Sequence, residues 1–212
     1  MVQISKLVPI GVLVASIVGG IIFFYLSSNL SKENKKVHIE QMISELVNFI
    51  VFIWVGKIVL NISLFVQDPL AIFAYPSDSR SFYIAVLCSS VSLFLKAKKG
   101  KINVVSLSKS FLPVFLVGSF LYEFIYIVFL SKGGPNGYFI LITIVLLLFL
   151  LLNGRLSTKL LFVMILAGWC FGILFLTFIQ PFVTVFGYIM APWFVGLFFI
   201  VNFFIIFRKR DF

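Results

Sequence analysis

Long apolar runs separated by short polar segments make up most of this chain. They predict seven helices, over residues 7–26, 42–66, 81–95, 110–130, 138–152, 160–179 and 182–207. Most of these runs reach or approach the ~20 residues that a helix needs to cross ~30 Å of hydrocarbon. A membrane β-barrel would instead show short segments in which apolar and polar residues alternate. The pattern therefore predicts an all-α, polytopic membrane helix bundle, which we expect to form a single integral membrane domain over residues 1–212.

Prolines and charged positions refine this pattern. The apolar tract after residue 160 is too long for one helix, and Gln180-Pro181 is its natural break. A kink is expected near Pro192 in the last helix. Pro113 is expected in the first turn of the fourth helix, where its missing N–H costs little. Residues 27–41 are basic and amphipathic, and we interpret them as a linker on the cytoplasmic side.

Small residues recur every four positions in two of the predicted helices. Gly11, Ala15 and Gly19 share one face of the first helix, and Gly168 and Gly172 share one face of the sixth. Small side chains at this spacing let two helix backbones approach closely inside a membrane. These faces are therefore predicted to be packing surfaces between helices.

The composition supports the membrane assignment. Of the 212 residues, 62% are hydrophobic, 18% are aromatic and only 11% are charged, which is far outside the range of soluble globular domains. The net charge is +10, and thirteen of the basic residues fall in alternate polar segments: Lys32, Lys35, Lys36, Lys96, Lys98, Lys99, Lys101, Lys109, Arg155, Lys159, Arg208, Lys209 and Arg210. Because cytoplasmic segments carry the excess of Lys and Arg, this distribution predicts the N-terminus outside and the C-terminus inside. It also indicates contact with anionic lipid rather than with nucleic acid.

Few residues offer catalytic or metal-binding chemistry. Cys88 and Cys170 both lie in apolar runs without a CxxC spacing, so the sequence predicts neither a redox pair nor a metal site. The one histidine, His38, falls in the basic linker and is expected to be solvated. No Ser-His-Asp or Cys-His arrangement and no glycine-rich phosphate loop can be assembled. We therefore expect no cofactor and no metal.

Two charges stand inside apolar runs. Lys57 lies about ten residues before the outer end of its predicted helix and Glu123 about eight, so the two share a depth of roughly 12–15 Å. Charges at such depths are costly unless they are paired or wetted. One hypothesis is a structural Lys–Glu pair. The other is that Lys57 neutralises a lipid phosphate or another anion, with Glu123 setting its orientation and protonation state.

A second group of polar residues is predicted at the outer membrane surface. It comprises Asp68, Tyr75, Asp78, Arg80 and Tyr83. In one interpretation Asp78 and Arg80 pair in a solvated turn, and the tyrosines belong to the ordinary aromatic belt. In the other, this loop frames the mouth of a lipid-binding cleft above the buried lysine.

The order of these features resembles the bacterial prolipoprotein diacylglyceryl transferase family. Residues 55–59 (VGKIV) stand where that family has G-G-R-[IL]-G, and residues 68–70 repeat its D-P-L. Residues 81–85 (SFYIA) occupy the place of S-F-H-G-G, and residues 122–126 (YEFIY) that of G-R-[IL]-G-N-F. Residues 171–180 follow its F-R-x-x-x-E-F-F-R helix. The resemblance covers about residues 45–210 and implies a seven-helix fold in the bacterial inner membrane. Members of the family transfer a diacylglyceryl group from phosphatidylglycerol to a lipoprotein cysteine.

The departures from the family pattern bear on activity. Tyr83 replaces the family's histidine, Glu123 an arginine and Tyr126 an asparagine. In the sixth helix, Gly172, Leu176 and Ile179 replace two arginines and a glutamate. Arginine binds a lipid phosphate in bidentate fashion and histidine transfers protons near neutral pH, so a site that lacks both is not expected to run the same reaction.

Three functional hypotheses follow. The first is a catalytically degenerate member of this fold that binds phospholipid, or a lipidated or membrane partner. The second is an active lipid or acyl transferase that uses Lys57, Glu123 and Tyr83 in altered roles. The third is a small transporter or a membrane subunit of a larger complex. The residues predicted to contact a lipid or another anion are Lys57, Asp68, Arg80, Tyr83, Glu123 and Tyr126.

Overall fold

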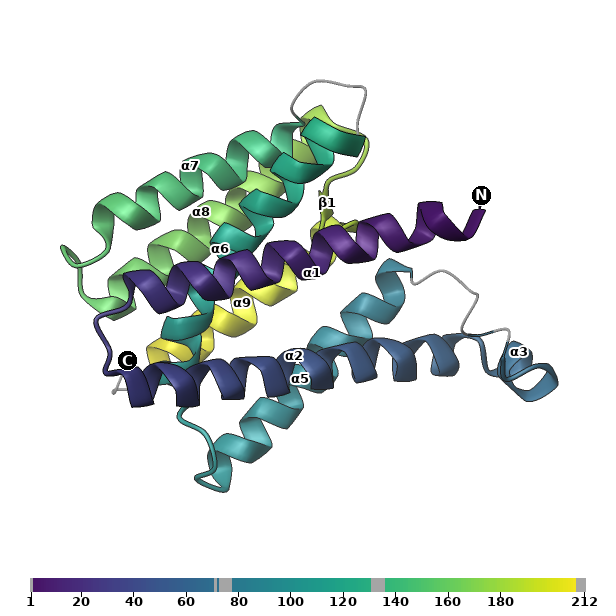
Figure 1. Cartoon of the computed structure of the whole chain (residues 1–212), viewed down its shortest axis with the longest axis horizontal. Helices are drawn as coiled ribbons and strands as arrows, with labels where there is room; N and C mark the ends of the chain where they lie inside the picture. Colours follow the sequence, from purple (N-terminus) through teal and green to yellow (C-terminus); the bar gives the residue numbers. More distant parts are fainter. Residues whose placement is uncertain (1, 71, 73–77, 131–135, 209–212) are drawn as a thin grey trace. The chain divides into compact units, whose positions relative to one another are not determined.

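The part of the chain that the structure describes is all-α apart from one very short β-hairpin (Figure 1). The computed structural model describes residues 2–70, 72, 78–130 and 136–208. The helices are α1 (Val2–Ser27), α2 (Lys32–Leu60), α3 (Ile62–Gln67), α5 (Ser79–Lys98), α6 (Val104–Ile125), α7 (Gly137–Leu152), α8 (Thr158–Ile179) and α9 (Pro192–Arg208). A π-helical turn, η1 (Tyr126–Leu130), extends α6, and strands β1 (Thr184–Val185) and β2 (Tyr188–Ile189) form the hairpin.

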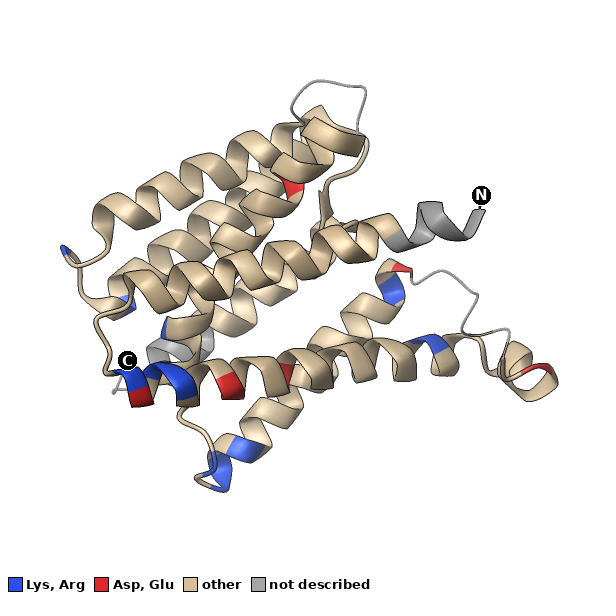
Figure 2. Cartoon of the chain, viewed as in Figure 1, with Lys and Arg blue, Asp and Glu red and all other residues tan. Residues whose placement is uncertain are grey.

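Five helical stretches in the described part of the chain are long and apolar enough to cross a membrane. They are Val8–Ser27, Lys32–Leu60, Ser79–Lys98, Val104–Leu130 and Thr158–Ile179. Helices α7 and α9 are apolar but shorter. Figure 2 shows long segments of α7 and α8 without charged residues, whereas the charged residues of α2 and α5 lie mostly toward the ends of those helices. This arrangement is compatible with an integral membrane protein, and the seven spans and their orientation stay predictions.

Local sequence explains where several of these helices begin. The side-chain oxygens of Ser31, Asp78, Asn136 and Ser157 accept a hydrogen bond from the backbone N–H three residues later, at the starts of α2, α5, α7 and α8. Such caps satisfy N–H groups that have no partner inside the helix. A short polar residue with a capping side chain therefore sets each of these boundaries.

The chain divides into two compact units, which are described separately. Unit 1 comprises Met1–Asn29 and Lys109–Phe212, and unit 2 comprises Leu30–Ser108. In unit 2, α2 and α5 pack against each other. Lys96 on α5 contacts Glu45, whereas Ser81 lies against Gly56, so the two helices are antiparallel. A Cβ atom on Gly56 would lie 3.0 Å from the Ser81 carbonyl oxygen, which shows how closely the two backbones approach.

In unit 1, α7 packs against α8 and α8 against α9, while α1 lies on α6. A Cβ on Gly20 would stand 2.5 Å from the Val114 carbonyl oxygen, so α1 and α6 touch backbone to backbone at this point. Gly172 of α8 similarly accommodates Leu141 of α7. By contrast, a Cβ on Gly11 or Gly168 would meet nothing within 4 Å. The prediction of small-residue packing faces is therefore confirmed at Gly172 and at Gly19, where a Cβ would meet the Leu121 side chain of α6, and not at Gly11 or Gly168.

Several predicted boundaries differ from the structure. Residues 32–41 belong to α2 rather than to a linker, since the cap at Ser31 starts that helix early. Helix α6 begins at Val104, so Pro113 lies inside it and not in its first turn. The last predicted helix, over 182–207, begins only at Pro192, and no kink is needed there because proline suits the first helical position.

Residues 182–191 contain the β-hairpin instead of helix. Thr184 pairs with Ile189 and Val185 with Tyr188, leaving a two-residue turn. Both turn residues have positive φ, 50° at Phe186 and 83° at Gly187. Positive φ at both central positions is the requirement of a type I′ turn, whose twist matches that of the paired strands. The apolar composition of this segment concealed the turn, since Phe is uncommon at positive φ.

Candidate functional site

Lys57 lies in the last turn of α2, closer to the helix end than the sequence suggested. Helix α2 ends at Leu60, and Asn61 stops it by donating from its side-chain amide to the Lys57 carbonyl oxygen at 2.9 Å. The residues predicted to continue this helix form the separate helix α3 (Figure 1). A cation in the last helical turn interacts favourably with the negative end of the helix dipole. This position explains part of how unit 2 tolerates the charge.

The Lys57 side chain is only 4% exposed. Its ammonium lies 5.1 Å from the centre of the Trp54 ring, within the range of a cation–π interaction. Asp78, at the start of α5, acts on it electrostatically, but no carboxylate of unit 2 lies within 4.0 Å in the described residues. The Asp78 carboxylate instead accepts hydrogen bonds from the Ser81 backbone and hydroxyl. Among the residues that the structure describes, the buried ammonium therefore has no direct ion pair in unit 2.

The other predicted residues of the outer loop in unit 2 divide by exposure. Tyr83 is buried, at 8% exposure, and its ring meets Phe82 edge to face at 6.3 Å. Asp68 and Arg80 are exposed, and Asp68 accepts from the Leu70 backbone N–H at 3.0 Å. The predicted Asp78–Arg80 pair does not form, since Asp78 serves as the α5 cap. Tyr75 lies outside the described residues.

Glu123 is buried in unit 1, at 2% exposure, on α6. Its Oε2 accepts a hydrogen bond from the Asn136 side-chain amide at 2.8 Å. The Oδ1 atom of the same asparagine accepts from the Phe139 backbone N–H at 2.7 Å and caps α7. Asn136 is thus held at both ends of its amide, and it links the carboxylate to the helix start.

Tyr126 lies one turn after Glu123, in the π-helical turn η1. It is 40% exposed and stacks on Tyr122 at 6.3 Å. The Tyr122 ring in turn meets Phe186 of the hairpin edge to face at 5.5 Å. Because Lys57 belongs to unit 2 and Glu123 to unit 1, the predicted pair between them stays a prediction.

A pocket of about 290 Å³ opens beside Asn136 in unit 1. It lies where the start of α7 meets the end of α8, and its polar lining consists of Asn136, Tyr138, Gln180 and Thr184. Residues 181–183 supply most of the apolar wall. The volume is close to the lower limit of ~300 Å³ for small-molecule sites in proteins. The pocket is therefore of a size to hold a small ligand or a headgroup rather than a whole lipid.

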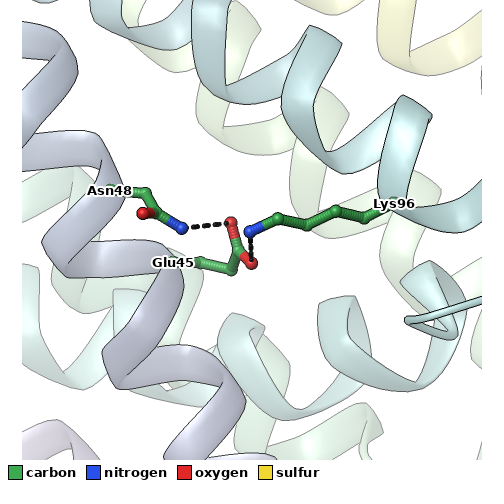
Figure 3. A network of polar contacts seen from close by, with 3 residues as sticks. All are labelled: Glu45, Asn48 and Lys96. Carbon is green, nitrogen blue, oxygen red and sulfur yellow. Dashed lines mark hydrogen bonds and ion pairs between the residues drawn. The ribbon is translucent and has the colours of Figure 1, made fainter.

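A polar network crosses between α2 and α5 in unit 2 (Figure 3). The Lys96 ammonium is 2.6 Å from Glu45 Oε1, and Asn48 donates to Glu45 Oε2 at 3.4 Å. The side chains of Lys96 and Glu45 are 30% and 15% exposed. Further toward the start of α2, His38 Nε2 lies 3.2 Å from the Ser106 hydroxyl, so this histidine is not simply solvated.

Sequence reasoning missed Asn136 and the Glu45–Lys96 pair. Asn136 stands directly ahead of a long apolar run, the usual signal for a helix cap, but its contact with Glu123 requires knowledge of the fold. The ion pair was accessible from topology. Two antiparallel helices joined near residue 70 bring Glu45 and Lys96 to the same level. Within the described residues no group of three or more His, Cys, Asp or Glu side chains could hold a metal ion.

Known proteins offer no direct guide to this arrangement. No protein-family model, no curated protein and no solved structure matches the chain.

Proposed function

We propose that this chain is a multi-pass protein of the bacterial inner membrane that binds anionic phospholipid through Lys57. It has the fold of the prolipoprotein diacylglyceryl transferases and is catalytically degenerate. The observation that carries the proposal is that the Lys57 ammonium is buried in unit 2 and that none of the described residues of that unit forms a direct ion pair with it. A buried cation of this kind is stabilised most effectively by an anion. The anion that a membrane supplies in abundance is a lipid phosphate.

The surroundings of Lys57 favour a phosphate at the ends of α2 and α5. The residue lies in the last turn of α2, three positions before its end, and its ammonium lies over the Trp54 ring. Arg80, in the first turn of α5, is exposed and offers a second cation to the same headgroup. Asp78 is engaged by the α5 cap and is directed to its own helix. The chemistry of this end of unit 2 is therefore that of a phosphate-binding surface.

The resemblance to the transferase family supports a phospholipid as the ligand. It does not support the family's transfer reaction. Tyr83 stands at the position of the family's histidine, and it is buried against Phe82. Histidine is the side chain suited to exchange protons near neutral pH, and tyrosine does not replace it in that role. The expected role is therefore retention of a lipid, or of a lipidated membrane partner, rather than group transfer.

Lipid binding is tested with the purified protein in mixed micelles of dodecyl maltoside and phosphatidylglycerol. We expect phosphatidylglycerol to raise the thermal midpoint and phosphatidylcholine to raise it less. Lys57→Met should weaken the phosphatidylglycerol affinity about tenfold, the loss of one hydrogen-bonded charge contact. Lys98→Met is the matched control, because Lys98 is exposed at the opposite end of α5. Equal affinity of Lys57→Met and the unchanged protein would refute the assignment.

The absence of transfer activity is tested separately. The protein is incubated with phosphatidylglycerol and a peptide that carries a lipoprotein cysteine, and the peptide mass is followed. We expect no diacylglyceryl adduct above a control without protein. An adduct that disappears in Lys57→Met would instead establish an active transferase with altered catalytic residues.

A further inference from the structure

The pocket beside Asn136 has polar groups that the protein itself leaves unused. In the part of the chain that the structure describes, the side chains of Gln180 and Thr184 form no hydrogen bond with another residue. Both line the pocket, where residues 180–184 have left the helix. Non-helical backbone in a membrane protein is tolerated where it is buried in protein or lines a wet cavity. These residues are consequently placed to bind a ligand.

Gly137 gives the Gln180 side chain its place. A Cβ on Gly137 would lie 2.7 Å from Gln180 Nε2 and 3.1 Å from its Cδ, so the amide of Gln180 rests directly on the start of α7. Gln180 and Asn136 both line the pocket. The missing side chain at position 137 thus leaves room for the Gln180 amide at the pocket.

The carboxyl group of Glu123 lies behind this wall and is bonded to Asn136. Within unit 1, Asn136 is its one hydrogen-bond donor among the described residues, although an ionised carboxylate has about four acceptor positions. Asn136 separates the carboxylate from the pocket by a single side chain. Helix α8 also ends at the pocket, at Ile179, and the carbonyl end of a helix carries partial negative charge. The positive end of α7 is already capped by Asn136. The carbonyl end of α8 and, when it is ionised, the Glu123 carboxyl group favour a cation at the pocket.

We propose that this pocket binds a primary ammonium group. Such a group carries three N–H donors, which match the oxygen atoms of Gln180 and Thr184 and the charge of Glu123. A quaternary ammonium has the same charge but no N–H donor, so the site should discriminate against it. The ammonium comes either from a phosphatidylethanolamine headgroup or from a free amine of similar size. This proposal concerns unit 1 and does not rest on the phosphate site at Lys57.

The test uses the full chain in dodecyl maltoside and measures the thermal midpoint with four additions. Two are lipids, phosphatidylethanolamine and phosphatidylcholine, which share a phosphate and differ in the methylation of the amine. Two are soluble, ethanolamine and choline. We expect each primary amine that binds to raise the midpoint more than its methylated counterpart. A preference among the lipids alone assigns the site to a headgroup, and a preference in both pairs assigns it to primary amines in general.

Variants tie the preference to the pocket. Glu123→Gln retains an acceptor for Asn136 and removes the charge, so affinity for the primary amine should fall about tenfold or more. Glu45→Gln is the matched control, a Glu-to-Gln change on a helix of unit 2, and it should keep the preference. Thr184→Val removes one acceptor with little change of shape and covers the case in which Glu123→Gln does not fold. Equal response to the methylated and unmethylated compounds in the unchanged protein, or an unaltered preference in Glu123→Gln and Thr184→Val, would overturn the proposal.

Discussion

Replacement of Gly20 by alanine tests how closely α1 and α6 pack in unit 1. The added Cβ would lie 2.5 Å from the Val114 carbonyl oxygen and 3.2 Å from the Val114 Cα, whereas ordinary contacts begin at 3.4 Å. The obstructing atoms belong to the backbone and cannot turn aside as a side-chain end can. The two helices must therefore separate or rotate locally by about 0.9 Å at this point.

The expected change in the free energy of unfolding follows from two opposing effects. Overpacking of a closely packed interface costs typically ~1–3 kcal/mol. Alanine is the better helix former and stabilises a helix by ~1 kcal/mol relative to glycine. Gly11→Ala in the same helix separates the two effects, because a Cβ there meets nothing within 4 Å. Gly11→Ala should be neutral or stabilising, and Gly20→Ala should be less stable than Gly11→Ala by about 1–3 kcal/mol.

Thermal unfolding of the purified variants in dodecyl maltoside measures this difference. For a chain of this length ~1 kcal/mol corresponds to roughly 2–4 °C in the midpoint. Gly20→Ala should therefore unfold several degrees below Gly11→Ala. If the two variants unfold at the same temperature, α1 does not contact α6 through Gly20, and the packing described for unit 1 is wrong.

Three further predictions use the same thermal measurement. Glu45→Gln should lower the free energy of unfolding by about 1–3 kcal/mol, because it leaves the half-buried ammonium of Lys96 without its carboxylate. Adding Lys96→Met should restore part of that loss, and additive losses in the double variant would contradict a direct pair. Gly187→Ala should lower the free energy of unfolding more than Gly154→Ala. Both glycines have positive φ, but only at Gly187 would the added Cβ meet a neighbour, a tyrosine hydroxyl at 3.2 Å. Equal losses in the two variants would mean that backbone strain accounts for the whole effect. Asn136→Ala should lower the free energy of unfolding by about 2–4 kcal/mol, since it removes the cap of α7 and the hydrogen-bond donor to the buried Glu123 carboxyl group. A loss below about 1 kcal/mol would mean that the bond to Glu123 contributes nothing to stability.

The comparison of Gly11 with Gly20 shows where prediction from sequence ended. Both residues are glycines of one apolar helix, and the four-residue spacing drew attention to Gly11, Ala15 and Gly19. Only the position of α6 shows that Gly11 faces open space, that Gly19 meets the Leu121 side chain and that Gly20 meets the Val114 backbone. The same holds for the hairpin after α8. Its apolar residues suit a helix locally, and the packing of Phe186 against Tyr122 and Phe115 favours the turn instead.

By itself the sequence determined the all-α class, the approximate positions of the long apolar helices and the importance of the charges inside apolar runs. Those features are local, since a run of apolar residues and the cost of a charge within it do not depend on the neighbours. The tertiary structure alone decided which groups satisfy the charges. Glu123 is bound by an asparagine 13 positions away and Glu45 by a lysine 51 positions away. Partners at such separations are fixed by how the helices pack, and helix packing depends on side-chain shape that no periodic pattern records.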